Sequence, residues 1–152
     1  MALLCSALTL GAASLSVVVL PLRPNTGKLN VEVSTAWPEP MLMFEPRPHD
    51  GPVLVVVRYK VSAENQTEFV EAMSRVRRSR LRTGGHSWRL YHSVEQADLY
   101  LERFTVVSWS EFERQRSERW LGYDSENFTK AVDYTVDHTR TDEYYIAKRV
   151  HR

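Results

Sequence analysis

The 152-residue chain has one cysteine, Cys5, and almost no net charge. One cysteine cannot form an internal disulfide, and it cannot supply the several thiolates of a cysteine-cluster metal site. A formal net charge of +1 provides no overall attraction to nucleic acid, so we expect no nucleic-acid partner. The sequence also lacks a Gly-rich phosphate loop, a nucleophile elbow and an HExxH pattern. We therefore predict neither a metal site nor a bound cofactor.

Proline is absent from residues 53–152, although the chain contains seven prolines. Proline removes a backbone donor and fixes φ, so we predict a linker over residues 23–51 and a folded domain over residues 52–152. Residues 29–34 alternate like a short half-buried strand. Trp37 and residues 41–44 are too apolar for a free linker, and we expect them to pack along the domain surface. A proline-rich recognition motif is disfavoured because its spacing and basic anchors are missing.

Charge is absent from residues 1–22, which are long enough to cross the hydrocarbon core of a membrane. Arg23 and Lys28 follow directly and are typical of a cytoplasmic flank. The small residues 11–14 would let a neighbouring helix approach closely. We therefore predict a transmembrane helix over residues 1–22. The alternatives are a signal-like segment, which would lack its basic beginning, and a helix that packs within a soluble protein.

The folded domain is predicted to begin with a β-branched strand over residues 53–61. Leu54 and Val56 make the start of this strand apolar on both faces, which indicates that both faces are covered. Ser62 is expected to cap a helix over residues 63–82, and Gly84 and Gly85 to end it.

The remaining elements follow from the same patterns. Two strands over residues 86–94 and 99–107 form a predicted hairpin. Ser108 and Glu111 form a predicted capping box for a helix that runs to about Trp120. After a break at Gly122, a further helix is expected through about residue 137, and a last strand over residues 142–150. The order β-α-β-β-α-β predicts an α+β, ferredoxin-like fold, with an antiparallel sheet and helices on one face.

The end of the first predicted helix is rich in arginine, at Arg75, Arg77, Arg78, Arg80 and Arg82. Arginine near a helix C-terminus is favoured by the helix dipole, so a solvated basic end is the first interpretation. The second interpretation is contact with anionic lipid head groups, where each arginine contributes about 1 kcal/mol.

The catalytic candidates are weak: Trp88, Tyr91, His92 and Glu102. Alternation along a strand puts Trp88 and His92 on one face and Tyr91 on the other, so these three do not converge. His92 and Glu102 would offer an acid–base pair if they meet across the hairpin. We favour the alternative, in which aromatic residues fill the sheet face and Glu102 pairs with an arginine. An enzyme is therefore not the preferred interpretation.

Residues 52–150 resemble the dimeric α/β-barrel fold of the antibiotic-biosynthesis-monooxygenase-like group. In addition, the succession WPEP, EP, GPVLVVVRYKV, RVRRSRLRTGG, WRLY and ERFTVVSW resembles the tail of a bacterial transporter family. That family is the transmembrane secretion effectors of the major facilitator superfamily, the enterobactin-exporter-like proteins. The resemblance implies that residues 1–22 are the last span of an exporter in the inner (plasma) membrane and that the remainder is cytoplasmic. One span cannot form a translocation path, so we expect a C-terminal piece or a truncated member.

The first hypothesis is therefore an exporter tail that serves in dimerisation, regulation or small-molecule sensing. Its expected partners are the membrane, a small-molecule ligand and a second copy bound through the open sheet face, with Leu54, Val56, Trp88 and Tyr91 as contact residues. The alternative is a small cofactor-independent or haem-acting monooxygenase of the same fold. A third hypothesis is a plain structural module that dimerises through the sheet.

Overall fold

The computed structural model describes residues 29–150. Its strands are β1 (Val53–Lys60), β2 (His86–His92), β3 (Leu99–Val106) and β4 (Thr141–Ile146). Its α-helices are α2 (Gln66–Arg82), α3 (Trp109–Arg114) and α4 (Gly122–Val132). Short helical turns complete the order, namely η1 (Ala63–Asn65) before α2, η2 (Gln115–Arg119) after α3, and η3 (Val136–His138) before β4.

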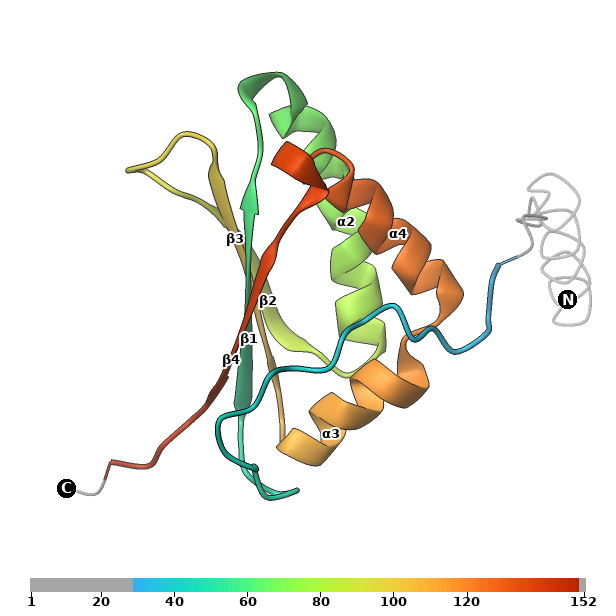
Figure 1. Ribbon diagram of the computed structural model, residues 1–152, viewed down its shortest axis with the longest axis vertical. Helices are drawn as coiled ribbons and strands as arrows, with labels where there is room; N and C mark the ends of the chain where they lie inside the picture. The colour runs from blue at the N-terminus through green and yellow to red at the C-terminus, as the bar shows by residue number, and fades with distance from the viewer. Residues whose placement is uncertain (1–28, 151–152) are drawn as a thin grey trace, which may run out of the picture.

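The four strands form one antiparallel sheet in the order β2-β3-β1-β4. The helices lie on a single side of this sheet, with α2 beside α4 and α3 near one end (Figure 1). This arrangement confirms the predicted α+β, ferredoxin-like fold. The central position of β1 explains its apolar sequence, since a strand paired on both edges and covered on one face has little contact with water.

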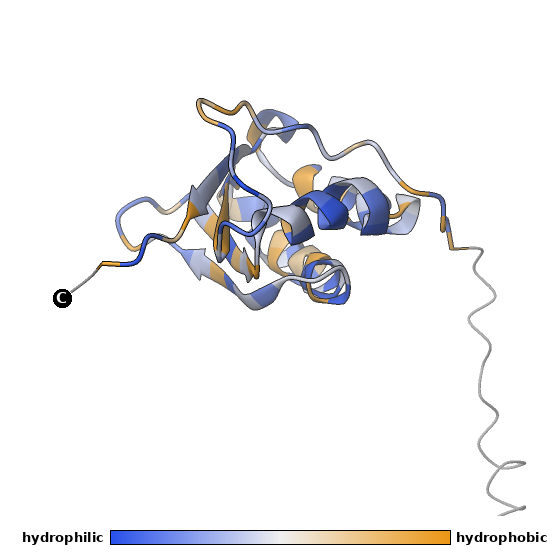
Figure 2. Ribbon diagram, turned by 90° about the horizontal axis from the view of Figure 1, so that it is seen from below, coloured by the Kyte–Doolittle hydropathy of each residue, from blue (hydrophilic) through white to orange (hydrophobic). Residues whose placement is uncertain are grey.

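The core lies between the sheet and the helices. Alternate residues of β1, from Val53 to Tyr59, face the helices and are almost fully buried. On α2, Phe69, Met73 and Val76 supply the facing apolar stripe at the i, i+4, i+7 spacing of one helix side. Figure 2 shows apolar residues distributed along the strands and along the helix sides that face them.

Several predicted boundaries shift in the structure. Helix α2 begins at Gln66, because residues 63–65 form a 3-10 turn. Gly122 opens α4 where we expected a break, and α4 ends at Val132 and not near residue 137. Asp137 and His138 have φ values of 54° and 51°, which an α-helix does not allow. The last strand ends at Ile146, four residues before the predicted end.

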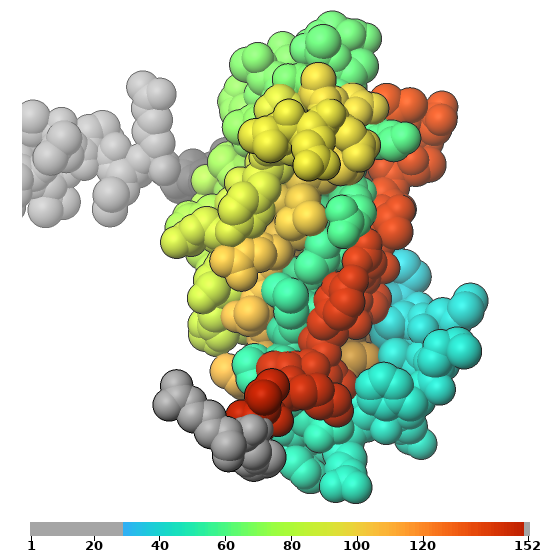
Figure 3. Space-filling view, turned by 90° about the vertical axis from the view of Figure 1, so that its left-hand side faces the viewer, coloured from blue at the N-terminus to red at the C-terminus, as the bar shows by residue number. Residues whose placement is uncertain are grey.

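The face of the sheet away from the helices, which we call the open face, carries Leu54, Val56, Tyr91, Leu101 and Tyr145. The strand register places these residues between the positions that point toward the helices. Within residues 29–150, no helix covers this face, and Figure 3 shows the strands lying side by side toward the viewer. The side chains of Tyr91 and Tyr145 are 44% and 49% exposed.

Residues 29–50, which we call the connector, run along the domain. Three backbone hydrogen bonds fasten the connector to the start of α4, from Ser34 N to Trp120 O, from Gly122 N to Glu32 O and from Tyr123 N to Asn30 O. The predicted strand over residues 29–34 is reduced to one isolated bridge at Val33. The expected packing is confirmed for Trp37, which is 6% exposed, and is wrong for Met41 and Met43, each 95% exposed.

The predicted membrane span over residues 1–22 lies outside the described residues. Among the helices of residues 29–150, none combines the length and the apolar character that a membrane crossing requires.

Candidate ligand-binding site

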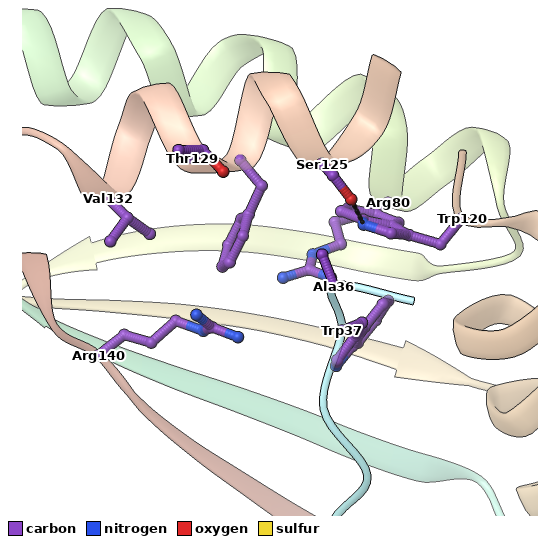
Figure 4. A pocket seen from close by; sticks show the side chains of 9 residues that line it. Ala36, Trp37, Arg80, Trp120, Ser125, Thr129, Val132 and Arg140 are labelled. Atoms are coloured by element: carbon purple, nitrogen blue, oxygen red, sulfur yellow. Dashed lines mark hydrogen bonds between the residues drawn. The ribbon is translucent and has the colours of Figure 1, made fainter. Parts of the chain in front are cut away.

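A cavity of about 110 Å³ lies between α4, the end of α2 and the connector (Figure 4). Its wall combines aromatic rings with two guanidinium groups. The lining residues are Ala36, Trp37, Arg80, Trp120, Ser125, Phe128, Thr129, Val132 and Arg140.

Arg80 projects from α2 into a cage of aromatic rings. Its guanidinium carbon lies 4.4 Å from the ring centroid of Trp37, 4.8 Å from Trp120, 4.9 Å from Phe104 and 5.0 Å from Phe128. Cation–π attraction strengthens when the cation is removed from water, and Arg80 is only 2% exposed. This burial corrects the prediction that Arg80 faces lipid head groups, because an arginine inside the domain cannot reach them.

Glu102 on β3 neutralises Arg80 and is itself fully buried. Its carboxylate accepts hydrogen bonds from Tyr59 Oη at 2.7 Å, Trp88 Nε1 at 2.8 Å and Arg80 Nε at 3.1 Å. Burial, together with the charge of Glu102, raises the pKa of Tyr59 well above its ordinary value. Burial alone would lower the pKa of Arg80, but Glu102, together with Tyr59 and Asp142, outweighs this effect, so the pKa of Arg80 is raised. The guanidinium of Arg80 is therefore charged at neutral pH.

Arg140 enters the cavity from the segment before β4. Its Nε donates to Asp142 Oδ1 at 2.9 Å, and its guanidinium lies 4.6 Å from the ring centroid of Phe128. Arg80 and Arg140 thus repeat one arrangement, in which Nε contacts a carboxylate of the sheet. Within residues 29–150, neither arginine makes a hydrogen bond through its terminal Nη atoms. Figure 4 shows both guanidinium ends directed into the cavity.

Trp37 brings the connector into the cavity wall. Its ring packs edge-on against Trp120 at 4.9 Å and Phe112 at 5.9 Å, and its Nε1 donates to Tyr144 Oη at 3.4 Å. Nearby, Trp120 Nε1 donates to Ser125 Oγ at 2.9 Å, which donates in turn to Ser34 Oγ at 2.7 Å. The connector is therefore held on both sides of the cavity.

The four catalytic candidates do not meet in this cavity. His92 is exposed, stacks on Tyr100 and contacts Ala97 O at 2.8 Å, so the proposed acid–base pair with Glu102 does not form. Glu102 pairs with an arginine, as the favoured alternative states. Trp88 and His92 share the helix side of β2 while Tyr91 lies on the open face.

This geometry corrects the placement of Trp88 on the expected dimer face, because its indole points toward Glu102 beneath the helices. Leu54, Val56 and Tyr91 do lie on the open face. Among the other arginines of α2, Arg75, Arg77 and Arg78 are exposed, and Arg82 pairs with the buried Asp124.

The family profile described as transmembrane secretion effector matches residues 1–143. The chain belongs to this family. Membership in the transmembrane secretion effectors indicates association with a membrane. No curated protein matches the chain.

Solved structures similar to this secretion effector share its fold at low sequence identity. SnoaB, a cofactor-independent oxygenase from Streptomyces nogalater, is 17% identical with a TM-score of 0.53, covering 64% of this chain and 94% of that one. A provisionally assigned antibiotic biosynthesis monooxygenase from Caulobacter crescentus is 15% identical with a TM-score of 0.57, covering 67% and 94%. At such identities, the likeness establishes the fold of the secretion effector domain and not its activity.

Only some of the residues that line the cavity could be recognised from the sequence. Trp37 stood out as too apolar for a linker, and Arg80 as part of an arginine cluster, although its direction was not apparent. Arg140 had no local signal, because only the pairing of β4 with β1 brings it beneath α4.

Proposed function

We propose that the chain is the C-terminal portion of a membrane exporter of the major facilitator type. In this proposal, residues 1–22 are its last span and the ferredoxin-like domain is cytoplasmic. The domain serves as a dimerisation, regulatory or small-molecule-sensing module and does not itself transport. The family match across residues 1–143 supports it, since this match joins the apolar segment and the domain in one unit.

The observation that carries the sensing role is the position of Trp37. The connector follows residues 1–28 directly and contributes this indole to the cavity wall. A ligand in the cavity would contact a segment that leads toward the membrane, so its binding would bias the packing of the connector. A ligand shifts an equilibrium only through a difference in affinity between two states, and undocking of Trp37 would supply that difference.

Dimerisation through the open face is supported by its apolar residues. Leu54, Leu101 and Tyr145 lie on neighbouring strands, flanked by the ion pair of Arg58 and Glu143 at 2.6 Å. Apolar contact area surrounded by charged residues is the usual composition of a protein interface.

The anchoring is tested by carbonate extraction of membranes that contain the full chain, which should leave the chain in the pellet. Dimerisation is tested by sedimentation of the detergent-solubilised full chain. We expect Leu54→Asp to convert a dimer to a monomer, while Val94→Asp, at an apolar position fully exposed on the hairpin, leaves the dimer intact. Release into the carbonate supernatant, or a wild-type monomer, would contradict the corresponding part of the proposal.

The exposed Arg75, Arg77 and Arg78 are proposed to approach anionic head groups once the domain is tethered. Amide hydrogen exchange in nanodiscs tests this point. Exchange at the exposed side of α2 should slow in anionic lipid relative to neutral lipid, and equal exchange would contradict the contact.

A cofactor-independent or haem-acting oxygenase is the second candidate function. It is favoured by the shared fold with SnoaB, a cofactor-independent oxygenase. Oxygen consumption by the full chain with a quinol, together with a haem titration, tests it. An absence of both oxygen uptake and spectral change would remove this candidate.

A further inference from the structure

We infer that the cavity binds a small carboxylate carried on a planar aromatic ring, with Arg80 and Arg140 donating to the carboxylate oxygens. This inference names the ligand class for the sensing role and rests on that proposed function. It is carried by two guanidinium groups that line one cavity and direct their terminal Nη atoms into it.

The first step concerns the direction of the donors. Each arginine is held by its Nε, Arg80 by Glu102 at 3.1 Å and Arg140 by Asp142 at 2.9 Å. Each carboxylate therefore fixes its guanidinium from the sheet side and leaves the terminal nitrogens facing the cavity. Guanidinium donors match the two oxygens of a carboxylate in one plane, and such pairs are stronger than hydrogen bonds between neutral groups.

The second step concerns charge. Although each arginine faces a carboxylate, the negative charge of Glu102 is shared among Tyr59, Trp88 and Arg80. The Arg80 cation has one carboxylate contact, and aromatic faces surround the rest of it. The donors directed into the cavity thus remain without an acceptor among residues 29–150. These nitrogens are not among the buried side-chain atoms that lack a partner, so a ligand would replace water there, and an anionic acceptor binds guanidinium donors more strongly than a neutral one.

The third step concerns the body of the ligand. Apart from the two arginines, the wall is formed mainly by Trp37, Trp120, Phe128 and Val132, which favour an apolar and flat partner. The cavity of about 110 Å³ is smaller than the roughly 150 Å³ cavity that admits benzene in another protein, so it holds no more than one ring. One aromatic ring is therefore the upper limit for the body of the ligand, and fused polycyclic compounds are too large.

The probe is benzoate, titrated calorimetrically into the detergent-solubilised full chain. Benzamide serves as the ligand control, because it keeps the ring and loses the negative charge. We expect benzoate to bind and benzamide to bind at least about 10-fold more weakly, as the difference between charged and neutral hydrogen bonds requires. Equal affinities would overturn the inference, as would the absence of benzoate binding.

The variant test uses Arg140, which is partly exposed at the rim and less embedded than Arg80. Arg140→Gln should weaken benzoate binding by about 10- to 100-fold. Arg140→Lys, which keeps the charge and loses the planar fork, should weaken it less. Arg58→Gln is the matched control, because Arg58 also holds a carboxylate through Nε but lies on the open face.

Urea unfolding of each variant, followed by tryptophan fluorescence, identifies any loss of folding. If Arg140→Gln does not fold, the comparison of Arg140→Lys with Arg58→Gln decides, and unchanged affinity in Arg140→Lys then overturns the inference. The outcome is separable from the proposed function. Benzoate binding to a chain that is monomeric and extractable by carbonate would support the ligand class and overturn the exporter tail. A membrane-bound dimer without benzoate affinity would support the exporter tail and overturn the ligand class.

Discussion

Replacing Glu102 by glutamine should destabilise the domain severely, because it leaves the buried guanidinium of Arg80 without its counter-charge. The side chains of Arg80 and Glu102 are 3% and 0% exposed, so water cannot take over the lost role. Removing one member of a buried ion pair typically costs about 3–5 kcal/mol. At about 4 °C per kcal/mol for a domain of this size, the midpoint of thermal unfolding should fall by about 12–20 °C.

The assay is thermal and urea unfolding of the full chain in mild detergent, each followed by tryptophan fluorescence. All four tryptophans, at positions 37, 88, 109 and 120, belong to the described residues, so the signal reports on the domain. Glu39→Gln is the matched control, because Glu39 also pairs with an arginine, Arg116, but is 83% exposed. It should leave the unfolding midpoint unchanged.

The pair itself is tested by combining Glu102→Gln with Arg80→Met. Methionine fills the aromatic cage without a charge, while the glutamine still accepts a hydrogen bond from Tyr59. The double variant should therefore lose less stability than the two single variants together, by about 3 kcal/mol. Strictly additive losses, or a Glu102→Gln protein as stable as the wild type, would refute the assignment of a buried charge pair.

Two further predictions concern neighbouring parts of the site. Trp37→Ala should destabilise the domain by about 3–5 kcal/mol, because it empties a buried aromatic position, and limited proteolysis should then cut the connector. Met43→Ala, at an exposed position of the same segment, should change neither the stability nor the proteolysis. Equal protease resistance of both variants would contradict the docking of the connector. Because the pKa of Tyr59 is raised in the folded state, its neutral form stabilises the fold at pH values below about 10, and this stability is lost as the pH rises further. Tyr59→Phe should therefore cost about 1 kcal/mol at neutral pH. The same substitution should also reduce the decline of the urea midpoint at alkaline pH. An unchanged alkaline decline would show that another group is responsible.

The fold was predictable because its signals are local and periodic. The β-branched run of β1, the apolar stripe of α2 and the alternation of β3 each identify an element within one short window. The boundaries were less predictable. Asp137 and His138 have positive φ values and lie in the short turn that leads to β4, and the apolar periodicity of the preceding helix does not reveal this turn.

The site was predicted less well, since its residues meet only through the tertiary structure. Arg75 and Arg80 look alike in the sequence, but five residues along a helix turn them to different sides, so one is exposed and the other caged. Strand alternation correctly separated Trp88 from Tyr91. It could not show which of the two faced the helices, and the expected dimer face therefore included Trp88 wrongly.

The coupling of the cavity to the connector is tested most directly by amide hydrogen exchange of the full chain with and without benzoate. The amides of Ser34, Gly122 and Tyr123 form the bonds between the connector and the start of α4. Ligand that binds only the docked state stabilises it by mass action, so these three amides should exchange more slowly as benzoate is added, and should not respond in Arg140→Gln. Benzoate binding that leaves their exchange unchanged would contradict a sensing role for the cavity.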